Sequence, residues 1–239
     1  MAGEASERQE TGLVNAINSG FGLNRGKPFT LRGVGGSSIT DCVRAEKFMG
    51  RSSSGNEPYT DVIVHRTRNR KVNLSCKGTS APSIAGGGLD GLEVAAPGLT
   101  KKFLDAALKR YKEMGFSEGM SNLPDMYGRV SAALKQQIVV GTVAMGGPID
   151  YMYIGPMNVT SSFSGGVLSV NGTLTGAVAY ANSHDLFLRL RKRRADQPFT
   201  EEVQSNLPVI LGRSPSRGDK GRRIVTTTST PSNAEIVTF

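Results

Sequence analysis

The chain has few of the residues on which many catalytic sites depend. Its 239 residues include only two histidines, His65 and His184, and two cysteines, Cys42 and Cys76. These four residues show no spacing typical of a zinc site, and no Gly-x-Ser-x-Gly motif occurs anywhere in the sequence. The sequence therefore argues against a zinc enzyme and a Ser–His–Asp hydrolase. Two cysteines suit a reducing compartment, and we expect free thiols, with a disulfide bridge as the alternative.

The sequence also lacks an apolar run of membrane-spanning length, and its first ten residues, MAGEASERQE, are polar and acidic. We therefore expect no signal peptide, no membrane partner and a cytoplasmic location. The segment GLNRGKPFT has some features of a phosphate-binding loop, but Pro28 follows Gly26–Lys27 where a Walker motif needs Ser or Thr. We accordingly expect no nucleotide cofactor.

Positive charge is abundant and unevenly distributed. The net charge is +9, from 29 basic and 20 acidic residues. Fourteen of the 29 basic residues fall in three short segments, Arg66–Lys71, Arg189–Arg194 and Arg213–Arg223. Concentrated positive charge is typical of surfaces that bind a phosphate backbone, so we expect contact with nucleic acid. A solvated or capsid-facing surface is the alternative.

Two short β-type runs, residues 61–65 and 72–77, flank a polar, basic turn and predict an antiparallel hairpin. With the turn centred near Asn69, Asp61 would lie opposite Lys77. One face of this hairpin would be apolar and suited to a core, and the other would be polar. The apolar face comprises Val62, Val64, Val72, Leu74 and Cys76, and the polar face comprises Asp61, Ile63, His65, Asn73, Ser75 and Lys77.

A glycine-rich loop, TSAPSIAGGG, follows the hairpin. Glycine permits close approach of the backbone to a ligand, so a polar strand face that ends at this loop is a candidate site. The alternative is that Asp61 and Lys77 form an ordinary ion pair on a solvated face.

The arrangement of Asp61 and the triplet Ser75–Cys76–Lys77 resembles the core of the PD-(D/E)XK (restriction-endonuclease-like) nucleases, and the sequence as a whole is similar to phage-type proteins. In that family the aspartate and a second acid hold Mg²⁺, and the lysine orients or activates the attacking water. Ser75 departs from the family, because Glu or Asp is usual there. Some members of the superfamily carry the missing acid on a neighbouring element, often a preceding helix.

Glu10 is the main candidate for that acid. Residues 6–19 predict a helix on which Leu13, Val14 and Ile17 form an apolar stripe, and Glu10 lies on the same stripe. A helix packed beside the hairpin could carry Glu10 towards Asp61. The alternative is that Glu10 lies at the solvent-exposed end of the apolar stripe. Other acids that could replace Glu10 are Asp90, Glu93, Asp125 and Asp150.

We expect an α/β (α+β) fold with a mixed central sheet flanked by helices and a β-rich C-terminal half. Helices are predicted over residues 40–50, 100–115 and 124–138, and short strand or irregular chain over 89–97. A hairpin is predicted at Asn171–Gly172, and strands over 185–193 and 224–228. Residues 1–145 would form a nuclease-like core, 146–228 its β-rich continuation, and 229–239 a loosely held tail.

These observations predict a Mg²⁺-dependent (or Mn²⁺-dependent) DNA endonuclease, because carboxylates are the only credible metal ligands and they favour hard cations. Cleavage of both strands would favour a homodimer, and a phage-type enzyme would act in the infected bacterial host cell. The alternatives are a non-enzymatic virion or nucleoprotein component and an inactive, DNA-binding member of the nuclease fold. The expected catalytic residues are Asp61, Lys77, Ser75 and Glu10, of which Asp61 and Glu10 would hold the metal. The expected nucleic-acid contacts are Arg66, Arg68, Arg70, Lys71, Arg189, Arg191 and Arg193.

Overall fold

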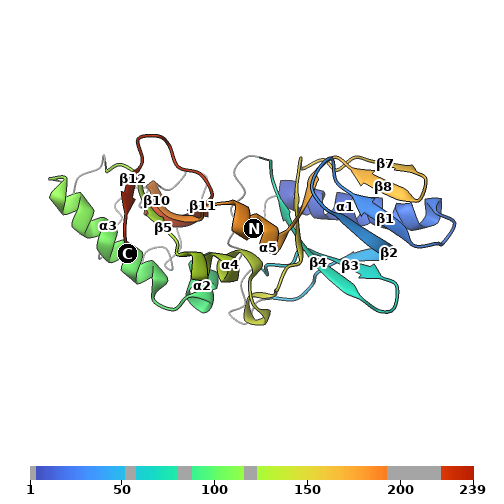
Figure 1. The fold of residues 1–239 in the computed structure, drawn as a ribbon, viewed down its shortest axis with the longest axis horizontal. Coiled ribbons are helices and arrows are strands. Elements are labelled where there is room, and N and C mark those ends of the chain that lie inside the picture. Colours follow the sequence, from blue (N-terminus) through green and yellow to red (C-terminus); the bar gives the residue numbers. More distant parts are fainter. Residues whose placement is uncertain (1–3, 52–57, 80–87, 116–122, 193–221) are drawn as a thin grey trace.

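A computed structural model describes residues 4–51, 58–79, 88–115, 123–192 and 222–239 of the chain. This part of the protein has an α/β fold with two mixed sheets, one of eight strands and one of four. Figure 1 shows the two sheets towards opposite ends of an elongated molecule, with helices α2 (Gly88–Ala95), α4 (Ala132–Val140) and α5 (Ala177–Ser183) between them. The predicted fold class, a mixed sheet flanked by helices, is confirmed.

The larger sheet has the strand order β7-β8-β1-β2-β3-β4-β6-β9. Its strands are β1 (Phe29–Arg32), β2 (Ser38–Lys47), β3 (Val62–Arg66), β4 (Lys71–Lys77), β6 (Tyr151–Ile154), β7 (Ser161–Ser164), β8 (Val167–Val170) and β9 (Thr173–Gly176). Strands β2, β3 and β4 form an antiparallel meander, and β6 runs parallel to β4.

The larger sheet curls until its distant parts touch. The segment after β1 hydrogen-bonds to the region of β9, from Val34 N to Gly172 O at 2.9 Å and from Ser37 N to Leu174 O at 2.7 Å. Gly36, between these contacts, has a φ of +83°, and a side chain there would overlap the backbone of Leu174. Glycine is therefore required where the sheet closes on itself.

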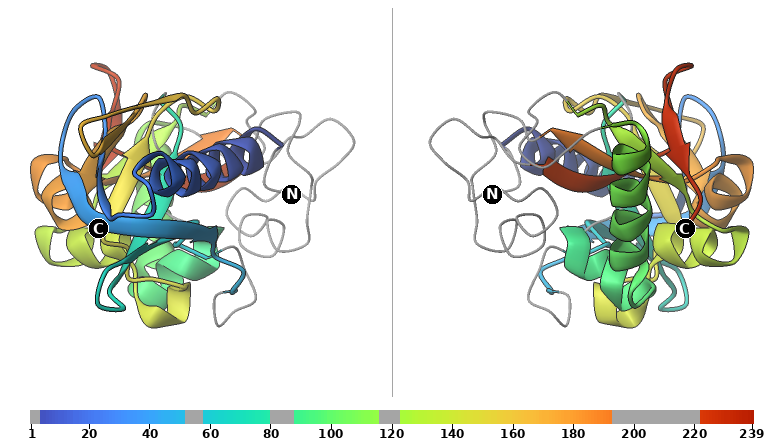
Figure 2. Two further views of the ribbon diagram at one scale, coloured as in Figure 1. Left: turned by 90° about the vertical axis from the view of Figure 1, so that its right-hand side faces the viewer. Right: turned by 90° about the vertical axis from the view of Figure 1, so that its left-hand side faces the viewer.

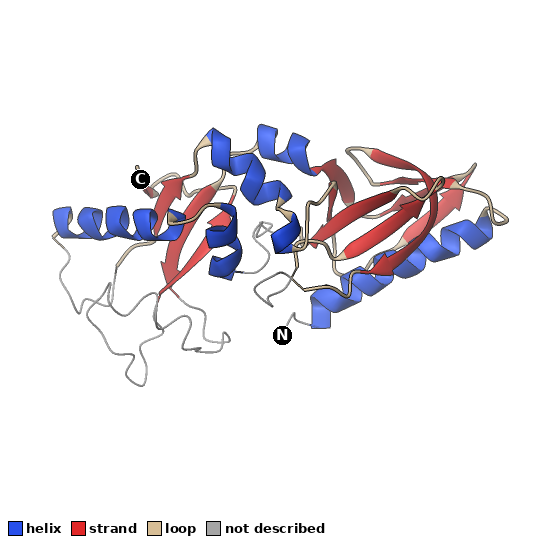
Figure 3. Ribbon diagram, turned by 90° about the horizontal axis from the view of Figure 1, so that it is seen from below, coloured by secondary structure: helices blue, strands red, loops and turns tan. Residues whose placement is uncertain are grey.

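Helix α1 (Glu4–Leu23) covers one face of the larger sheet. Figure 3 shows the helix beginning near the middle of the molecule and running outward along the sheet. Leu13 and Ile17 of this helix are fully buried with Leu31, Val64 and Leu74 of the strands. Burying the apolar stripe against the sheet stabilises a helix that would be marginal in isolation.

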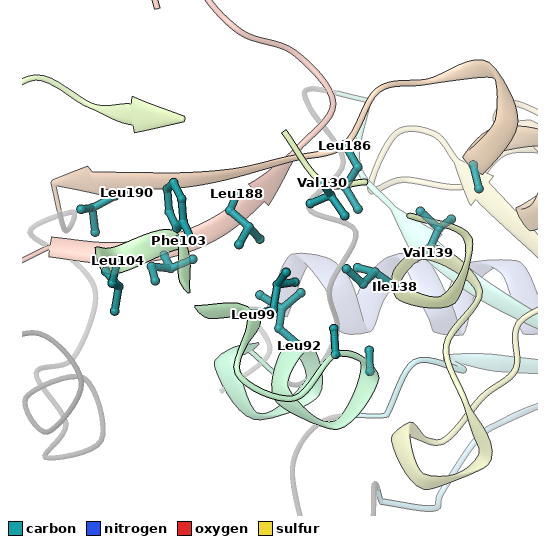
Figure 4. Close-up of a cluster of buried hydrophobic side chains, with 14 of the residues drawn as sticks. Leu92, Leu99, Phe103, Leu104, Val130, Ile138, Val139, Leu186, Leu188 and Leu190 are labelled. Atoms are coloured by element: carbon teal, nitrogen blue, oxygen red, sulfur yellow. The ribbon is translucent and has the colours of Figure 1, made fainter. Parts of the chain in front are cut away.

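The smaller sheet has the order β11-β10-β5-β12 and packs against helix α3 (Leu99–Glu113). Its strands are β5 (Met126–Arg129), β10 (Phe187–Lys192), β11 (Arg222–Thr227) and β12 (Glu235–Val237). Helices α1 and α3 face the viewer in the left and right panels of Figure 2. Phe103 of α3 and Leu188 of β10 belong to a second hydrophobic core, separate from the core between α1 and the larger sheet (Figure 4).

The helix predicted over residues 40–50 is wrong, because this segment forms strand β2. Its buried residues Ile39, Cys42 and Ala45 are three apart, a spacing that imitates a helical stripe. The spacing arises from two irregularities. The pairing with β1 shifts between Ile39 and Cys42, where Asp41 has a φ of +60°, and the pairing with β3 shifts between Cys42 and Arg44. Each shift changes the phase of side-chain alternation within the strand.

Other local predictions also differ from the structure. Asn171–Gly172 does not connect a hairpin, because β8 pairs with β7 and β1 whereas β9 pairs with β6. The two-residue turn is instead Gly165–Gly166 between β7 and β8, with φ values of +56° and +77°. The segment 124–138, predicted as one helix, forms strand β5 followed by helix α4. The segment 89–97, predicted as strand or irregular chain, lies mostly in helix α2. Helix α3 and strand β10 confirm the predictions made for those regions.

The C-terminal residues are integrated into the fold, contrary to the prediction of a loosely held tail. Strand β12 pairs in parallel with β5, and Phe239 contacts Phe103 with ring centroids 5.3 Å apart. The smaller sheet thus combines residues 126–129 with segments after residue 186, so a boundary at residue 145 does not separate the two sheets. None of the helices in the described ranges has the length and apolar character needed to cross a lipid bilayer.

Candidate active site

The β3–β4 hairpin has the predicted faces but a different register. Val62 pairs with Leu74 and His65 with Lys71, two residues away from the predicted pairing. The turn causes this difference. Arg68 and Asn69 both adopt positive φ values in it, and the observed strand pairing is centred on Arg68, one residue before the predicted centre. A two-residue shift returns every side chain to its original face. The apolar side, including Val62 and Leu74, is accordingly buried as expected.

The altered register places Asp61 beside Ser75 instead of directly opposite Lys77. Asp61 N donates to Leu74 O at 2.9 Å, which holds the residue at the start of β3. Its carboxylate Oδ2 accepts hydrogen bonds from Ser75 Oγ at 3.1 Å and from Cys76 N at 2.6 Å. Ser75, only 1% exposed, therefore fixes the orientation of the Asp61 carboxylate.

Opposing effects act on the ionisation of Asp61. Burial raises the pKa of its carboxyl group above the ordinary value. The positive charge of Lys77, the hydrogen bonds from Cys76 and Ser75, and the charge of Lys47 all act to lower the same pKa. Asp61 is therefore a largely desolvated carboxyl group whose hydrogen-bond partners are Ser75 and Cys76.

Helix α1 brings Glu10 to the same end of the hairpin. The preceding residue, Gln9, is buried, and its Nε2 donates to the carbonyl oxygens of Lys77 at 3.1 Å, Gly155 at 2.9 Å and Pro156 at 3.3 Å. These bonds attach the helix to the ends of β4 and β6. Burial raises the pKa of the Cys76 thiol, and the negative charges of Asp61 and Glu10 raise it further.

Lys47, at the end of β2, belongs to this cluster but was not anticipated from the sequence. Its Nζ lies 3.0 Å from Glu10 Oε2 and 3.7 Å from Glu7 Oε1. Because residues 40–50 were predicted to be helical, nothing placed Lys47 beside the hairpin. Recognition of the bulge in β2 would have been needed to find it.

Three of the alternative acids have structural roles elsewhere. Glu93 accepts hydrogen bonds from the backbone N–H groups of Gly98 and Thr100, at 2.6 and 2.9 Å, at the start of α3. Asp125 pairs with Arg189, and Asp150 Oδ2 accepts a hydrogen bond from Asn73 N at 2.8 Å. The side chain of Asp90 lies outside the described residues.

The predicted nucleic-acid contacts do not form one surface with this cluster. The hairpin tip carries Arg66, Arg68, Arg70 and Lys71. Lys77 lies six positions after Lys71 along β4, so the tip lies about 20 Å from the cluster. Two of the tip arginines are engaged within the protein: Arg66 Nε donates to Thr40 O at 2.7 Å, and Arg70 lies 2.9 Å from Asp41 Oδ2.

The arginines of β10 belong to the smaller sheet, whereas Asp61 and its neighbours belong to the larger sheet. Arg189 donates to Asp125 Oδ2 from Nε at 2.9 Å and from Nη2 at 2.6 Å, and its guanidinium lies over the ring of Tyr127. The alternative that this strand contacts acidic neighbours within the protein therefore holds for Arg189. Arg191 lies on the same strand, and Arg193 lies outside the described residues.

The side chains in the cluster suit a hard cation. Asp61, Glu10 and Ser75 offer carboxylate and hydroxyl oxygens, the ligand type that Mg²⁺ and Mn²⁺ prefer. Among the residues that the structure describes, no group of three or more His, Cys, Asp or Glu side chains is arranged to hold a metal ion.

Comparisons of the chain with protein-family models, with curated proteins and with solved structures found no match. The assignment of a function accordingly depends on the residues and geometry of the cluster.

Proposed function

We propose that the protein is a Mg²⁺-dependent DNA endonuclease with a PD-(D/E)XK-like site. The observation that carries the proposal is that three elements meet at one end of the hairpin: α1, which carries Glu10, is joined to the end of β4 by the bond from Gln9 Nε2 to Lys77 O at 3.1 Å, and Asp61 bonds to Ser75 of the same strand at 3.1 Å. Glu10 lies on the helix that precedes the hairpin, where the resemblance to that superfamily allows the second acid.

Each residue has a role that follows from its environment. Asp61 and Glu10 would hold the metal ion, and Ser75 keeps the Asp61 carboxylate oriented through its 3.1 Å hydrogen bond. The bound ion would supply Lewis-acid activation of a phosphodiester and neutralise negative charge on it. Lys77, with its charge near Asp61, would orient the attacking water. Ser75 thus supports the metal-binding aspartate in place of the usual acid.

The wider assignments belong to the same proposal. The substrate would be DNA, as the net charge of +9 favours a polyanionic partner. Cleavage of both strands would require two sites, which a homodimer would provide. The protein would act in the cytoplasm of a phage-infected bacterial cell.

One experiment tests this function directly. Supercoiled and linear DNA are incubated with the protein in Mg²⁺ or EDTA, and the wild type is compared with Asp61→Ala and Lys77→Ala. Glu4→Gln, an exposed change on α1, is the matched control. We expect metal-dependent nicking that both site variants lose and the control retains. The absence of cleavage by correctly folded wild type would refute the endonuclease.

The same experiment addresses a second candidate, a DNA-binding protein without nuclease activity. The replacement of the usual acid by Ser75 and the 3.0 Å ion pair between Glu10 and Lys47 favour this candidate. Salt-sensitive DNA binding without cleavage would support it. Neither binding nor cleavage would point to the non-enzymatic virion component.

A further inference from the structure

Lys47 lies between the helix and the strands that carry the two proposed metal-binding carboxylates. It is the last residue of β2 and pairs with Val62, so it lies on the sheet face that α1 covers. Its Nζ is 3.0 Å from Glu10 Oε2 and 3.7 Å from Glu7 Oε1. A single ammonium group thus contacts two acids that are one helical turn apart.

The burial of the two acids distinguishes their contacts with Lys47. The side chain of Glu7 is 69% exposed, whereas that of Glu10 is 15% exposed. Water strongly screens the pair between Lys47 and Glu7, so this pair contributes little to stability. The pair between Lys47 and Glu10 is screened much less. Lys47 therefore compensates the negative charge of Glu10.

We propose that Lys47 is a positioning residue that holds Glu10 and neutralises its charge until a divalent cation takes its place. The inference rests on the proposed function, because it concerns the same metal site. The cation and the ammonium group compete for the carboxylate of Glu10, so metal binding requires Lys47 to release it. Lys47 thereby keeps the largely buried carboxylate of Glu10 compatible with the folded, metal-free protein.

Competition of this kind predicts the effect of removing the charge. A unit charge within a few ångströms of a carboxylate changes its proton affinity by about 10-fold to 1000-fold. A divalent cation experiences the same field more strongly. We therefore expect Lys47→Met to bind Mn²⁺ at least about 10-fold more tightly than the wild type. Lys47→Arg, which retains the charge, should bind within a few-fold of the wild type.

The test is a titration of Mn²⁺ with each protein, in which free Mn²⁺ is measured by electron paramagnetic resonance. Lys71→Met is the matched control, because it removes the same charge from an exposed residue at the distant hairpin tip. Physiological ionic strength, with a Debye length of about 8 Å, limits general charge effects. Tighter binding confined to Lys47→Met would support the proposal.

A second measurement covers the case in which Lys47→Met does not fold. Wild-type protein is acylated with an amine-reactive reagent with and without Mn²⁺, and the labelled lysines are identified by mass spectrometry. We expect labelling of Lys47 to increase several-fold with Mn²⁺ while labelling of Lys71 stays constant. Unchanged labelling of Lys47 at saturating Mn²⁺ would overturn the proposal.

The outcomes separate this inference from the function on which it rests. Wild-type protein that binds no Mn²⁺ would overturn the metal-dependent function and, with it, the inference. Wild-type protein that binds Mn²⁺ with an affinity that Lys47→Met leaves unchanged or weakens would overturn the inference alone. In that case Lys47 would be a structural link between α1 and β2.

Discussion

Gln9 provides the sharpest test of how the site is assembled, because its side chain attaches α1 to the ends of two strands. The amide is 1% exposed and donates to the carbonyl oxygens of Lys77, Gly155 and Pro156. Replacement by leucine retains the size of the side chain but removes the donor. The carbonyl of Lys77 would keep a hydrogen bond from Gly155 N at 2.9 Å, so the main loss falls on Gly155 and Pro156.

The size of the effect follows from the burial of these bonds. The bond to Gly155 is buried, and the other two are partly buried. One buried acceptor left without a partner costs about 1–3 kcal/mol, and water can replace part of the rest. We therefore expect Gln9→Leu to lower the free energy of unfolding by about 1–3 kcal/mol. With a urea m-value of about 3 kcal/mol/M, the midpoint falls by about 0.3–1 M.

Gln9→Glu adds a pH dependence to the same test. At neutral pH a carboxylate would face three carbonyl oxygens, so this variant should be less stable than Gln9→Leu. Burial would raise the pKa of the new carboxyl group above its ordinary value of about 4.3. The destabilisation relative to wild type should therefore shrink as the pH falls towards 4, where the protonated group can donate one hydrogen bond.

Urea unfolding followed by circular dichroism measures both effects. Asn15→Leu, on an exposed position of α1, is the matched control and should change stability by less than about 0.5 kcal/mol. Because Gln9 precedes Glu10, Gln9→Leu should also weaken Mn²⁺ binding. If the stability of Gln9→Leu equals that of the control, Gln9 does not anchor the helix and our reasoning on the site is wrong.

Two further predictions concern the partly buried Asp61 and the packing around the C-terminus. Burial raises the pKa of Asp61, so the wild type loses stability as the pH rises through that pKa. Asp61→Asn should thus melt at a higher temperature than the wild type at pH 7, and this difference should disappear below the ordinary aspartate pKa of about 3.9. Equal melting temperatures of the two proteins at pH 7 would contradict this prediction. A side chain on Gly128 would approach Phe239 Cε1 to 2.5 Å and Phe103 Cδ2 to 2.6 Å. Gly128→Ala should therefore cost about 1–3 kcal/mol in urea unfolding, and Phe239→Ala in the same chain should relieve part of that cost; additive losses would argue against the contact.

Much of the local structure could be predicted where a single periodicity persists. The alternation of Val62, Val64, Val72 and Leu74 predicts the buried face of the hairpin correctly. This prediction tolerates the wrong register because a two-residue shift preserves the faces. Helix α3 has a stripe of helical period, and β10 alternates between leucines and arginines, so both were predictable for the same reason.

The failures have physical causes that one sequence does not reveal. In β2 a bulge at Asp41 changes the phase of alternation and imitates a helix. At Asn171 the local signal for a tight turn yields to tertiary contacts, because the Asn171 side chain accepts hydrogen bonds from Tyr153 Oη and Thr160 N. Long-range pairing likewise places β12 beside β5, although the C-terminal residues carry no strong strand pattern.

The site was predictable in proportion to how local its residues are. Asp61 and Ser75 share one hairpin, so spacing alone brings these two residues close, although the expected pairing of Asp61 with Lys77 is not the observed one. The position of Glu10 depends on where the first helix packs, and α1 contacts β2 and β4. Lys47 depended on the fold of β2 and was missed.

The central claim is that Glu10 and Asp61 act together at one metal-dependent site. The most direct test is the rate of Mg²⁺-dependent DNA cleavage by Glu10→Gln, Asp61→Asn and the double variant. If the two carboxylates share one cation, each single change should reduce the rate by about 100-fold or more, and the double variant should be little slower than either. Glu10→Gln that cleaves like the wild type, or losses that multiply in the double variant, would contradict the claim.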